Sequence, residues 1–348
     1  MKHGSQPTRD LVERDIQAQS QPMIDPVGRK VDYLRVSVTD RCNERCLYCM
    51  PEQFQQWIPR KEVLTDDELL AVIDTAAELG FRKFRITGGE PMVRPKFPEL
   101  VQRILQIPGV ESLSMTTNGT RLRSLAQPLW DAGLRKFNMS LDAIDPDIYQ
   151  TVTGGRLADV IAGLEAAQAA GFQQIKLNTV LMRGKNDDQI LPLLDFAAER
   201  KLTLRFIELM PVSLTEVLDE SNFLPLAEVR DMLEQDDEIS LCEHQEAFGF
   251  GPARYYHLKR RGIKVGFIGA MTDLNFCEQC NKMRLTCDGM LRPCLGNHME
   301  TDLKQALRPE FDLAQLKGLF LKGLGEKPEA HLFRENYQPQ RIMTAIGG

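Results

Sequence analysis

Seven of the eight cysteines in this chain fall into two groups whose spacing suits metal binding or redox chemistry. The first group is Cys42, Cys46 and Cys49, and the second is Cys277, Cys280, Cys287 and Cys294. Eight cysteines among 348 residues are too few for a disulfide scaffold. The polar residues 1–30 contain no apolar run typical of a secretory signal, so we expect a reducing, cytoplasmic location. In that setting, clustered thiols usually bind metal.

The first group has the spacing C-x3-C-x2-C and follows a strand-like run. Three thiolates so close together can hold three irons of a [4Fe-4S] cluster, which leaves the fourth iron open to another ligand. A structural zinc site needs four protein ligands, and this loop contains no fourth cysteine or histidine. The spacing therefore favours an iron–sulfur cluster.

The second group has the spacing C-x2-C-x6-C-x6-C. Four cysteines at this spacing could form a closed zinc site, and three of them could hold a second cluster. Spacing alone leaves both interpretations open.

Basic and polar side chains also recur inside the strand-like runs. Lys83 and Arg85 alternate within one run, and Lys176 and Asn178 alternate within another, so each pair faces one side of its strand. Arg35 and Arg205 lie in two further runs. An exposed strand face would explain any one of them, but together they favour a polar barrel interior that binds a polyanion.

Strands that alternate with helices must position these residues. The strand-like runs are 33–38, 83–87, 113–117, 136–141, 175–182 and 203–209. The clearest helices span 65–80, which opens with a Thr65–Glu68 capping box, 157–170 and 187–201. Six such units predict an α/β fold, an open (β/α)6 partial barrel over residues 31–215. Residues 247–270 suggest a short irregular sheet, and the acidic run 234–238 a solvated turn.

Composition sets further bounds on function. Hydrophobic residues make up 43% and charged residues 26%, and no run approaches the length of a membrane span. The net charge of −6 argues against general nucleic-acid binding but permits a local basic pocket.

The first cysteine loop resembles the signature of the radical S-adenosylmethionine (SAM) superfamily. The run Thr87-Gly88-Gly89-Glu90-Pro91, one unit later, strengthens the resemblance. It implies that SAM binds the open iron, that one electron cleaves it, and that the resulting 5′-deoxyadenosyl radical abstracts a substrate hydrogen. The implied SAM contacts are Tyr48, Gly89, Ser140 and Met210. In isolation, Ser140 and Met210 would be ordinary turn or core residues.

The segment from Cys277 to Cys294 resembles the second-cluster loop of the GTP 3′,8-cyclases, the MoaA family of molybdenum-cofactor biosynthesis. The resemblance covers about residues 31–348 and includes Leu34 to Cys42, Arg85 to Pro91, Thr116 to Gly119, Ser140 to Asp142 and the terminal Gly347-Gly348. It implies that Cys277, Cys280 and Cys294 hold a second [4Fe-4S] cluster, whose open iron binds the guanine of GTP. The implied GTP contacts are Arg35, Lys83, Arg85, Thr116, Lys176, Arg205, Lys282 and Arg284. Two positions depart from the family: Lys282 stands where Arg is common, and Cys287 is an extra thiol.

The resemblance further implies that Gly347 and Gly348 reach into the active site as catalytic elements. We expect an N-terminal extension over 1–30, the partial barrel, a C-terminal second-cluster domain over 216–340 and a tail over 341–348. The implied reaction is radical cyclisation of GTP to 3′,8-cyclo-7,8-dihydro-GTP. It needs an external electron donor and a downstream pyranopterin-forming enzyme, and a homodimer is possible. Two alternatives stay open: another two-cluster radical SAM enzyme, of the peptide- or sulfatase-maturing type, and a non-enzymatic zinc or redox regulator.

Overall fold

All six predicted strands are present in the computed structural model, which describes residues 22–51, 53–215, 221–242, 251–335 and 337–347. They are β1 (Tyr33–Ser37), β2 (Lys83–Thr87), β3 (Ser112–Thr117), β4 (Lys136–Ser140), β5 (Gln174–Leu181) and β6 (Thr203–Glu208). Each is parallel to the next along the chain. Their carboxyl ends therefore meet at one rim, where parallel α/β sheets bind ligands.

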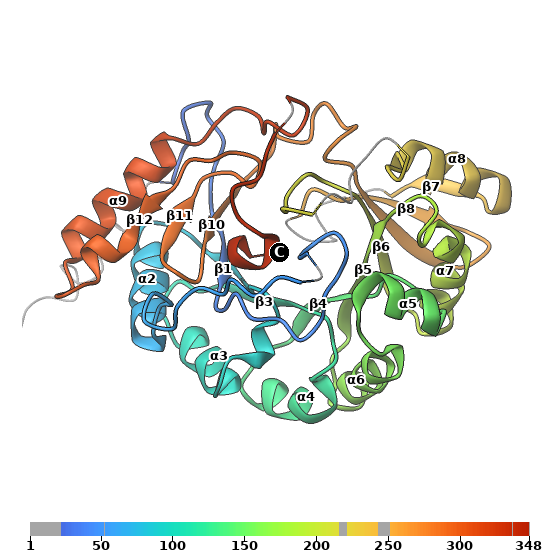
Figure 1. Ribbon diagram of the computed structural model, residues 1–348, viewed down its shortest axis with the longest axis horizontal. Coiled ribbons are helices and arrows are strands. Elements are labelled where there is room, and N and C mark those ends of the chain that lie inside the picture. Colours follow the sequence, from blue (N-terminus) through green and yellow to red (C-terminus); the bar gives the residue numbers. More distant parts are fainter. Residues whose placement is uncertain (1–21, 52, 216–220, 243–250, 336, 348) are drawn as a thin grey trace, which may run out of the picture.

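Helices cover the outside of this sheet (Figure 1). They are α2 (Asp66–Glu78), α3 (Phe97–Leu105), α4 (Leu122–Asp131), α5 (Pro146–Thr153), α6 (Leu157–Ala169) and α7 (Ile190–Glu199). The predicted capping box opens α2: the Thr65 hydroxyl accepts from the Glu68 amide at 3.2 Å, and the Glu68 carboxylate accepts from the Thr65 amide at 2.7 Å. The helix predicted over 187–201 begins as a 3-10 turn, Asp187–Gln189, before α7.

The C-terminal half of the chain extends the same sheet at both edges. Strand β9 (Ile263–Ile268) lies parallel to β6, and β10 (Lys282–Leu285) lies parallel to β1. Beyond them, β8 (Arg254–Leu258) and β7 (Ile239–Leu241) continue one edge, and β11 (Met290–Arg292) and β12 (Thr301–Asp302) the other. The described residues thus form a 12-stranded sheet that ends at β12 and β7 and does not close. The prediction of an open α/β barrel is confirmed, with β9 and β10 added to its six parallel strands.

The acidic run at 234–238 differs from the expected solvated turn. Residues 234–236 end helix α8 (Leu226–Asp236), and Asp237 is buried. Its carboxylate accepts hydrogen bonds from the backbone amides of Arg260 at 2.7 Å and Arg261 at 3.2 Å. Burial alone would raise the pKa of Asp237, but these hydrogen bonds bring it below its usual value. The expectation was wrong for Asp237 because charge patterning does not reveal a buried anchor for the β8–β9 turn.

The chain returns to the middle of the barrel at its C-terminal end. Helix α9 (Leu313–Gly325) packs on the outside near α2, where Phe320 contacts Phe81 with ring centroids 5.9 Å apart. The following segment crosses the mouth of the barrel, and the short helix α10 (Met343–Ile346) lies near its centre (Figure 1). Among the described helices, none combines the length and the apolarity that crossing a membrane requires.

Candidate functional site

The first cysteine loop leaves the carboxyl end of β1 and lies directly against the glycines that follow β2. The amide of Gly89 donates to the Thr39 carbonyl at 2.8 Å, and the amide of Glu90 donates to the Arg41 carbonyl at 2.8 Å. A Cβ on Gly88 would lie 2.3 Å from the Thr39 carbonyl oxygen, and one on Gly89 would lie 2.2 Å from that of Arg41. The resemblance implied that Gly89 contacts SAM. The structure shows that they first make room for the backbone that carries the cysteines.

The three thiols of this loop suit a cluster better than a single ion. Burial raises the pKa of Cys42 to about 12 and also raises those of Cys46 and Cys49, with the neighbouring thiols adding to the shifts of the latter two. A multivalent metal group is the natural way to hold all three as thiolates, because metal binding releases their protons. Across the described ranges, no three Cys, His, Asp or Glu side chains are arranged to hold one metal ion. A [4Fe-4S] cluster fits the loop because each thiolate binds a different iron.

Three buried carboxyl groups surround this loop, and the sequence analysis assigned none of them. Glu90 accepts hydrogen bonds from the Thr117 hydroxyl at 2.9 Å and the Asn118 amide at 2.7 Å. Glu44 accepts from the hydroxyl of Tyr149 at 2.9 Å. Burial raises the pKa of Glu90 to about 7 and that of Glu44 to about 8. When ionised, these groups give this side of the barrel a negative potential suited to a cationic ligand. The signal available in the sequence was the position of Glu90 directly after the two glycines that follow a predicted strand.

The third carboxyl group, Asp142, contacts one of the predicted SAM residues. The hydroxyl of Tyr48 donates to Asp142 at 2.7 Å, and the Val180 amide donates to it at 2.9 Å. Burial raises the pKa of Asp142 to about 6. Ser140 ends β4 beside Asn178 of β5, and Met210 follows β6 and packs against a cluster that includes Val212 and Phe333. These positions all lie at or beyond the carboxyl ends of their strands.

Strand register brings basic residues from five strands together, and we call this set the cation wall. Its members are Arg35, Arg85, Lys176, Arg205, Lys282 and Arg284. Arg35 on β1 stands between Arg284 on β10 and Arg85 on β2. The ring of Tyr33 lies between the Arg85 guanidinium, 5.9 Å from its centroid, and the Lys282 ammonium, 5.6 Å away. On the other side, Arg205 of β6 donates to Asn178 of β5 at 2.9 Å.

Five members of the cation wall have depressed pKa values: Arg35, Lys176, Arg205, Lys282 and Arg284. Burial lowers the pKa of Lys176 to about 7, with the charges of Arg205 and Arg85 contributing to the shift. Burial lowers that of Arg284 to about 10 and that of Arg35 well below its usual value, with neighbouring arginines contributing to both. Cations crowded at low solvent exposure strongly favour an anionic ligand, which would relieve their repulsion.

Two of the predicted GTP contacts, Lys83 and Thr116, already have partners within the protein. The ammonium of Lys83 forms an ion pair with Asp32 at 2.8 Å, so a protein carboxylate already balances its charge. Asn281 donates to the same carboxylate at 2.9 Å. The hydroxyl of Thr116 accepts a long hydrogen bond of 3.5 Å from Arg85.

In the second cysteine group, Cys277, Cys280 and Cys294 lie near one another, and Cys287 lies elsewhere. Burial raises the pKa of Cys294, and the nearby thiols of Cys280 and Cys277 add to that shift. Cys287 is fully buried and lies instead beside Ser37, Asp40 and Asp288. Cys287 therefore has different neighbours from the other three thiols, which share Lys327, and this argues against a site closed by all four cysteines.

Two basic residues that the sequence analysis missed contact the second cysteine group. Lys327 donates a hydrogen bond to the Cys280 thiol at 3.5 Å. Arg29, in the segment before β1, donates to the Cys277 carbonyl at 2.9 Å and is paired with Asp25 at 2.6 Å. A lone basic residue in a polar segment carries no motif, so neither residue could be predicted from the sequence.

The described part of the C-terminal tail lies inside the barrel, at the ends of β1 and β2. Gly347 has φ +90°, and a Cβ there would lie 3.0 Å from both the Ser37 Cβ and the Thr87 Cγ2, at the ends of β1 and β2. Arg341 anchors the tail by ion pairs to Asp288 at 2.9 Å and Glu300 at 3.0 Å. Gly348, the other predicted tail residue, lies outside the described residues.

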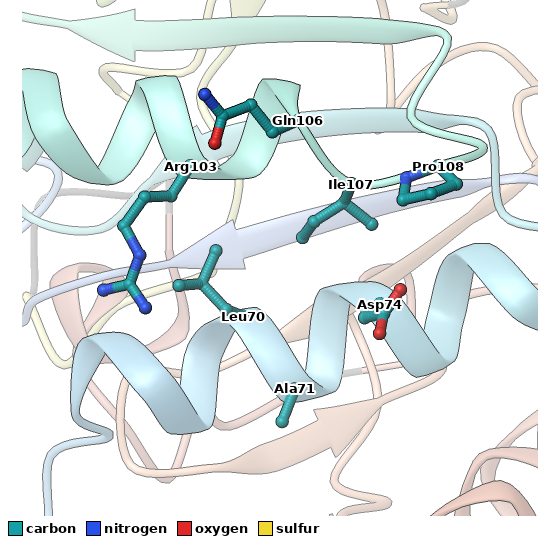
Figure 2. Close-up of a pocket in the computed structure, with 7 residues that line it drawn as sticks. All are labelled: Leu70, Ala71, Asp74, Arg103, Gln106, Ile107 and Pro108. Atoms are coloured by element: carbon teal, nitrogen blue, oxygen red, sulfur yellow. The ribbon is translucent and has the colours of Figure 1, made fainter.

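A shallow cleft of about 340 Å³ lies elsewhere, outside the barrel between α2 and α3 (Figure 2). Leu70, Ala71 and Ile107 give it an apolar floor, and Asp74 and Arg103 stand at its sides. Arg103 is already paired with Asp67 at 2.6 Å. This cleft contains no cysteine and takes no part in the site.

Comparison with known proteins finds two family models and relatives that align with most of this chain. Residues 36–197 match the family model of the radical SAM superfamily, and residues 202–333 match that of Molybdenum Cofactor Synthesis C. The GTP 3′,8-cyclase of Pelotomaculum thermopropionicum is 42% identical over 327 residues, covering 94% of this chain and 100% of that protein. The GTP 3′,8-cyclase of Pseudomonas entomophila is 44% identical over 334 residues, covering 94% of this chain and 98% of that protein.

Two solved structures share the fold at low identity. Streptococcus suis SuiB bound to S-adenosylmethionine has a TM-score of 0.60 at 16% identity, covering 90% of this chain and 77% of that one. Native anSMEcpe with bound AdoMet has a TM-score of 0.57 at 16% identity, covering 86% of this chain and 82% of that one. At this identity the likeness concerns the fold alone.

Proposed function

Because this chain belongs to the GTP 3′,8-cyclase family of radical SAM enzymes, we propose that its cation wall binds the triphosphate of GTP. The chain is a radical SAM lyase, and its reaction is the cyclisation of GTP that begins molybdenum-cofactor biosynthesis. The product is (8S)-3′,8-cyclo-7,8-dihydroguanosine 5′-triphosphate. Its cofactors are SAM and two [4Fe-4S] clusters.

The single observation that carries the substrate assignment is the crowding of cations in the barrel, where Arg205 is buried and the other members of the cation wall are half-buried. Burial and the neighbouring positive charges of Arg205 and Arg85 bring the pKa of Lys176 down to about 7, which a dense anion would reverse. A triphosphate supplies several negative charges at one place, and guanidinium groups bind phosphate oxygens in pairs. A peptide offers no comparable charge, so the wall favours GTP over the substrate of a peptide-maturing enzyme.

We assign the first cluster to Cys42, Cys46 and Cys49, and SAM to the space beside Tyr48, Gly89, Ser140 and Met210. When bound, this cluster supplies the electron that cleaves SAM. The protein holds the loop in place through Gly88 and Gly89, which pack on its backbone. When ionised, Glu90, Glu44 and Asp142 favour the positively charged sulfonium and amino groups of SAM on this side of the barrel.

We assign the second cluster to Cys277, Cys280 and Cys294, with Cys287 as a spare thiol. The remaining predicted GTP contacts, Lys83 and Thr116, then lie at the edge of the phosphate region. Lys83 contributes less than the cation wall because Asp32 balances its charge at 2.8 Å. We propose that the tail, in which Gly347 lies beside Ser37 and Thr87, excludes water from the reacting atoms.

Further expectations concern the chain's surroundings. We propose a cytoplasmic enzyme that takes electrons from an external donor and passes its product to a pyranopterin-forming enzyme, and that can form a homodimer. We propose that the chain consists of an extension over 1–30, a barrel over 31–215, a second-cluster domain over 216–340 and a tail over 341–348.

An anaerobic assay tests the function directly. The chain, reconstituted with iron and sulfide, is incubated with GTP, SAM and a reductant, and products are resolved by mass. We expect 5′-deoxyadenosine and the cyclised nucleotide in equal amounts, and about eight irons per chain. Changing Cys42, Cys46 and Cys49 together to Ser should abolish both products but keep about four irons. Formation of 5′-deoxyadenosine by that variant would refute the assignment of the first loop. Zinc in place of iron would favour the regulatory alternative.

A further inference from the structure

Lys327 is a buried lysine whose three N–H donors all point at the second cysteine group. Lys327 is only 4% exposed and lies two positions after the end of α9. The ammonium donates to the Cys280 thiol at 3.5 Å, to the Lys282 carbonyl at 2.8 Å and to the Pro293 carbonyl at 2.8 Å. A lysine has three donors, so all of them are used at this one place.

The two carbonyls that bind Lys327 belong to the chain segments that carry cluster ligands. Lys282 begins β10, two residues after Cys280, and Pro293 follows β11, one residue before Cys294. One ammonium therefore joins the segments of two ligands, in addition to touching one of the thiols.

The segment that contains Lys327 also reaches the third ligand, through Arg29. The guanidinium of Arg29 donates to the Pro328 carbonyl at 2.6 Å, the Glu329 carbonyl at 2.7 Å and the Cys277 carbonyl at 2.9 Å. Residues 327–329 are thus connected to all three cysteine segments, two through Lys327 and one through Arg29.

The charge of Lys327 has its negative partner in the thiol group. Among the ion pairs formed within the described ranges, none joins Lys327 to a carboxylate. A buried ammonium is costly unless an opposite charge or good acceptors stabilise it. Two carbonyls and a cluster thiolate would do so, and the ammonium in turn would stabilise negative charge on the cluster.

We propose that Lys327 is a positioning residue for the second cluster, which fixes the segments of Cys280 and Cys294 and raises the reduction potential of the cluster they hold. The proposal rests on the assignment of Cys277, Cys280 and Cys294 to a [4Fe-4S] cluster. Reduction adds negative charge, so a cation and an N–H···S hydrogen bond beside one ligand favour the reduced form. Losing a hydrogen bond to a charged group typically corresponds to about a tenfold change in an equilibrium.

The test uses the full chain with Cys42, Cys46 and Cys49 changed to Ser, so that only the second cluster gives a signal. In this background we compare Lys327→Met, Lys327→Arg and, as a matched control, Lys322→Met, which removes an exposed lysine of α9. Iron content, melting temperature and the midpoint potential from a redox titration followed by electron paramagnetic resonance are measured.

We expect Lys327→Met to lower the ratio of reduced to oxidised cluster about tenfold at a fixed potential, a shift of about 59 mV for one electron. Lys327→Arg should recover most of that shift, and Lys322→Met should match the parent. Loss of iron in Lys327→Met alone would also support the positioning role. A Lys327→Met variant with the parent's iron content and midpoint potential would overturn the proposal. If the parent background itself held no iron, the cluster assignment would fail instead.

Discussion

The guanidinium of Arg284 donates a hydrogen bond of 2.6 Å to the carbonyl oxygen of Gly347. Arg284 lies on β10, four residues after Cys280, and Gly347 lies at the end of the chain. A residue predicted to bind GTP therefore also holds the tail that was predicted to enter the active site. The substrate pocket and the tail share this side chain, so each should influence the other.

Deleting Gly347 and Gly348, or changing Gly347 to Ala, should reduce cyclisation by at least about tenfold. At φ +90° an alanine is strained, and its Cβ would press on Ser37 and Thr87 at 3.0 Å. Iron content and melting temperature should change little, because the buried side chain of Ile346, which precedes the altered residues, still anchors the tail. Turnover is measured by product mass.

Gly325→Ala is the matched control for the tail, since a Cβ there meets nothing within 4 Å. It should leave turnover unchanged. Full activity of the truncated chain would show that the two glycines are not needed for turnover.

Arg85→Ala and Arg205→Ala should weaken GTP binding much more than SAM binding. A hydrogen bond to a charged group is worth about 1.5–3 kcal/mol, or roughly 10- to 150-fold in affinity. Lys83→Ala should cost less, because Asp32 already pairs with Lys83 at 2.8 Å. Dissociation constants for GTP, guanosine and SAM are compared by calorimetry. Equal affinity of the parent chain for guanosine and GTP would exclude a triphosphate pocket.

GTP affinity should fall as pH rises from 7.5 to 9, and Lys176 should cause the fall. Burial and the charges of Arg205 and Arg85 lower its pKa to about 7, so the free protein loses this charge above pH 7. A bound triphosphate raises the pKa again, so binding takes up a proton and weakens by at most about tenfold per pH unit. Calorimetry in two buffers of different ionisation enthalpy measures the proton uptake.

Lys176→Met should remove both the proton uptake and the slope, at the cost of weaker binding at pH 7. An unchanged pH slope in this variant would assign the effect to another group.

Cys287→Ser should keep iron content and turnover, whereas Cys294→Ser should lose the second cluster. Cys287 is fully buried beside Ser37, away from the three thiols that gather near Lys327. A fourth thiolate would fill the iron that the guanine needs. Iron analysis separates the two cases, and a loss of four irons from Cys287→Ser would point to ligation by all four cysteines.

The barrel strands could be predicted well from local patterns in the sequence. The bounds predicted for β2 coincide with those observed, and those of β3 and β5 differ by a residue at one or both ends. The capping box at Thr65 is also present as predicted, because both of its hydrogen bonds lie within three residues. The cysteine groups and the alternating basic positions are likewise local patterns.

Long-range contacts were beyond the reach of sequence patterns. Two antiparallel strands as well as α8 separate β6 from β9, and β10 pairs with β1 from the far end of the chain, so neither forms a simple βαβ unit and they could not be counted with the six. Asp237, Lys327 and Arg29 act through partners distant in the sequence or through backbone carbonyls. A single charged residue gives no periodic signal of such a role.

The placement of β9 and β10 has a consequence for the order in which the protein is made. These strands are close in the sequence, yet they border opposite edges of the run from β1 to β6. The connection over residues 269–281 therefore spans the open side of the barrel, and it carries Cys277 and Cys280. As the ribosome releases the chain, the first cysteine loop and its supporting strands can fold while these residues are still unsynthesised. Pairing of β10 with β1 joins residues about 250 apart, and such non-local contacts form late and slowly. Maturation of the two metal sites should accordingly be sequential, with the second completed only when the barrel is bridged.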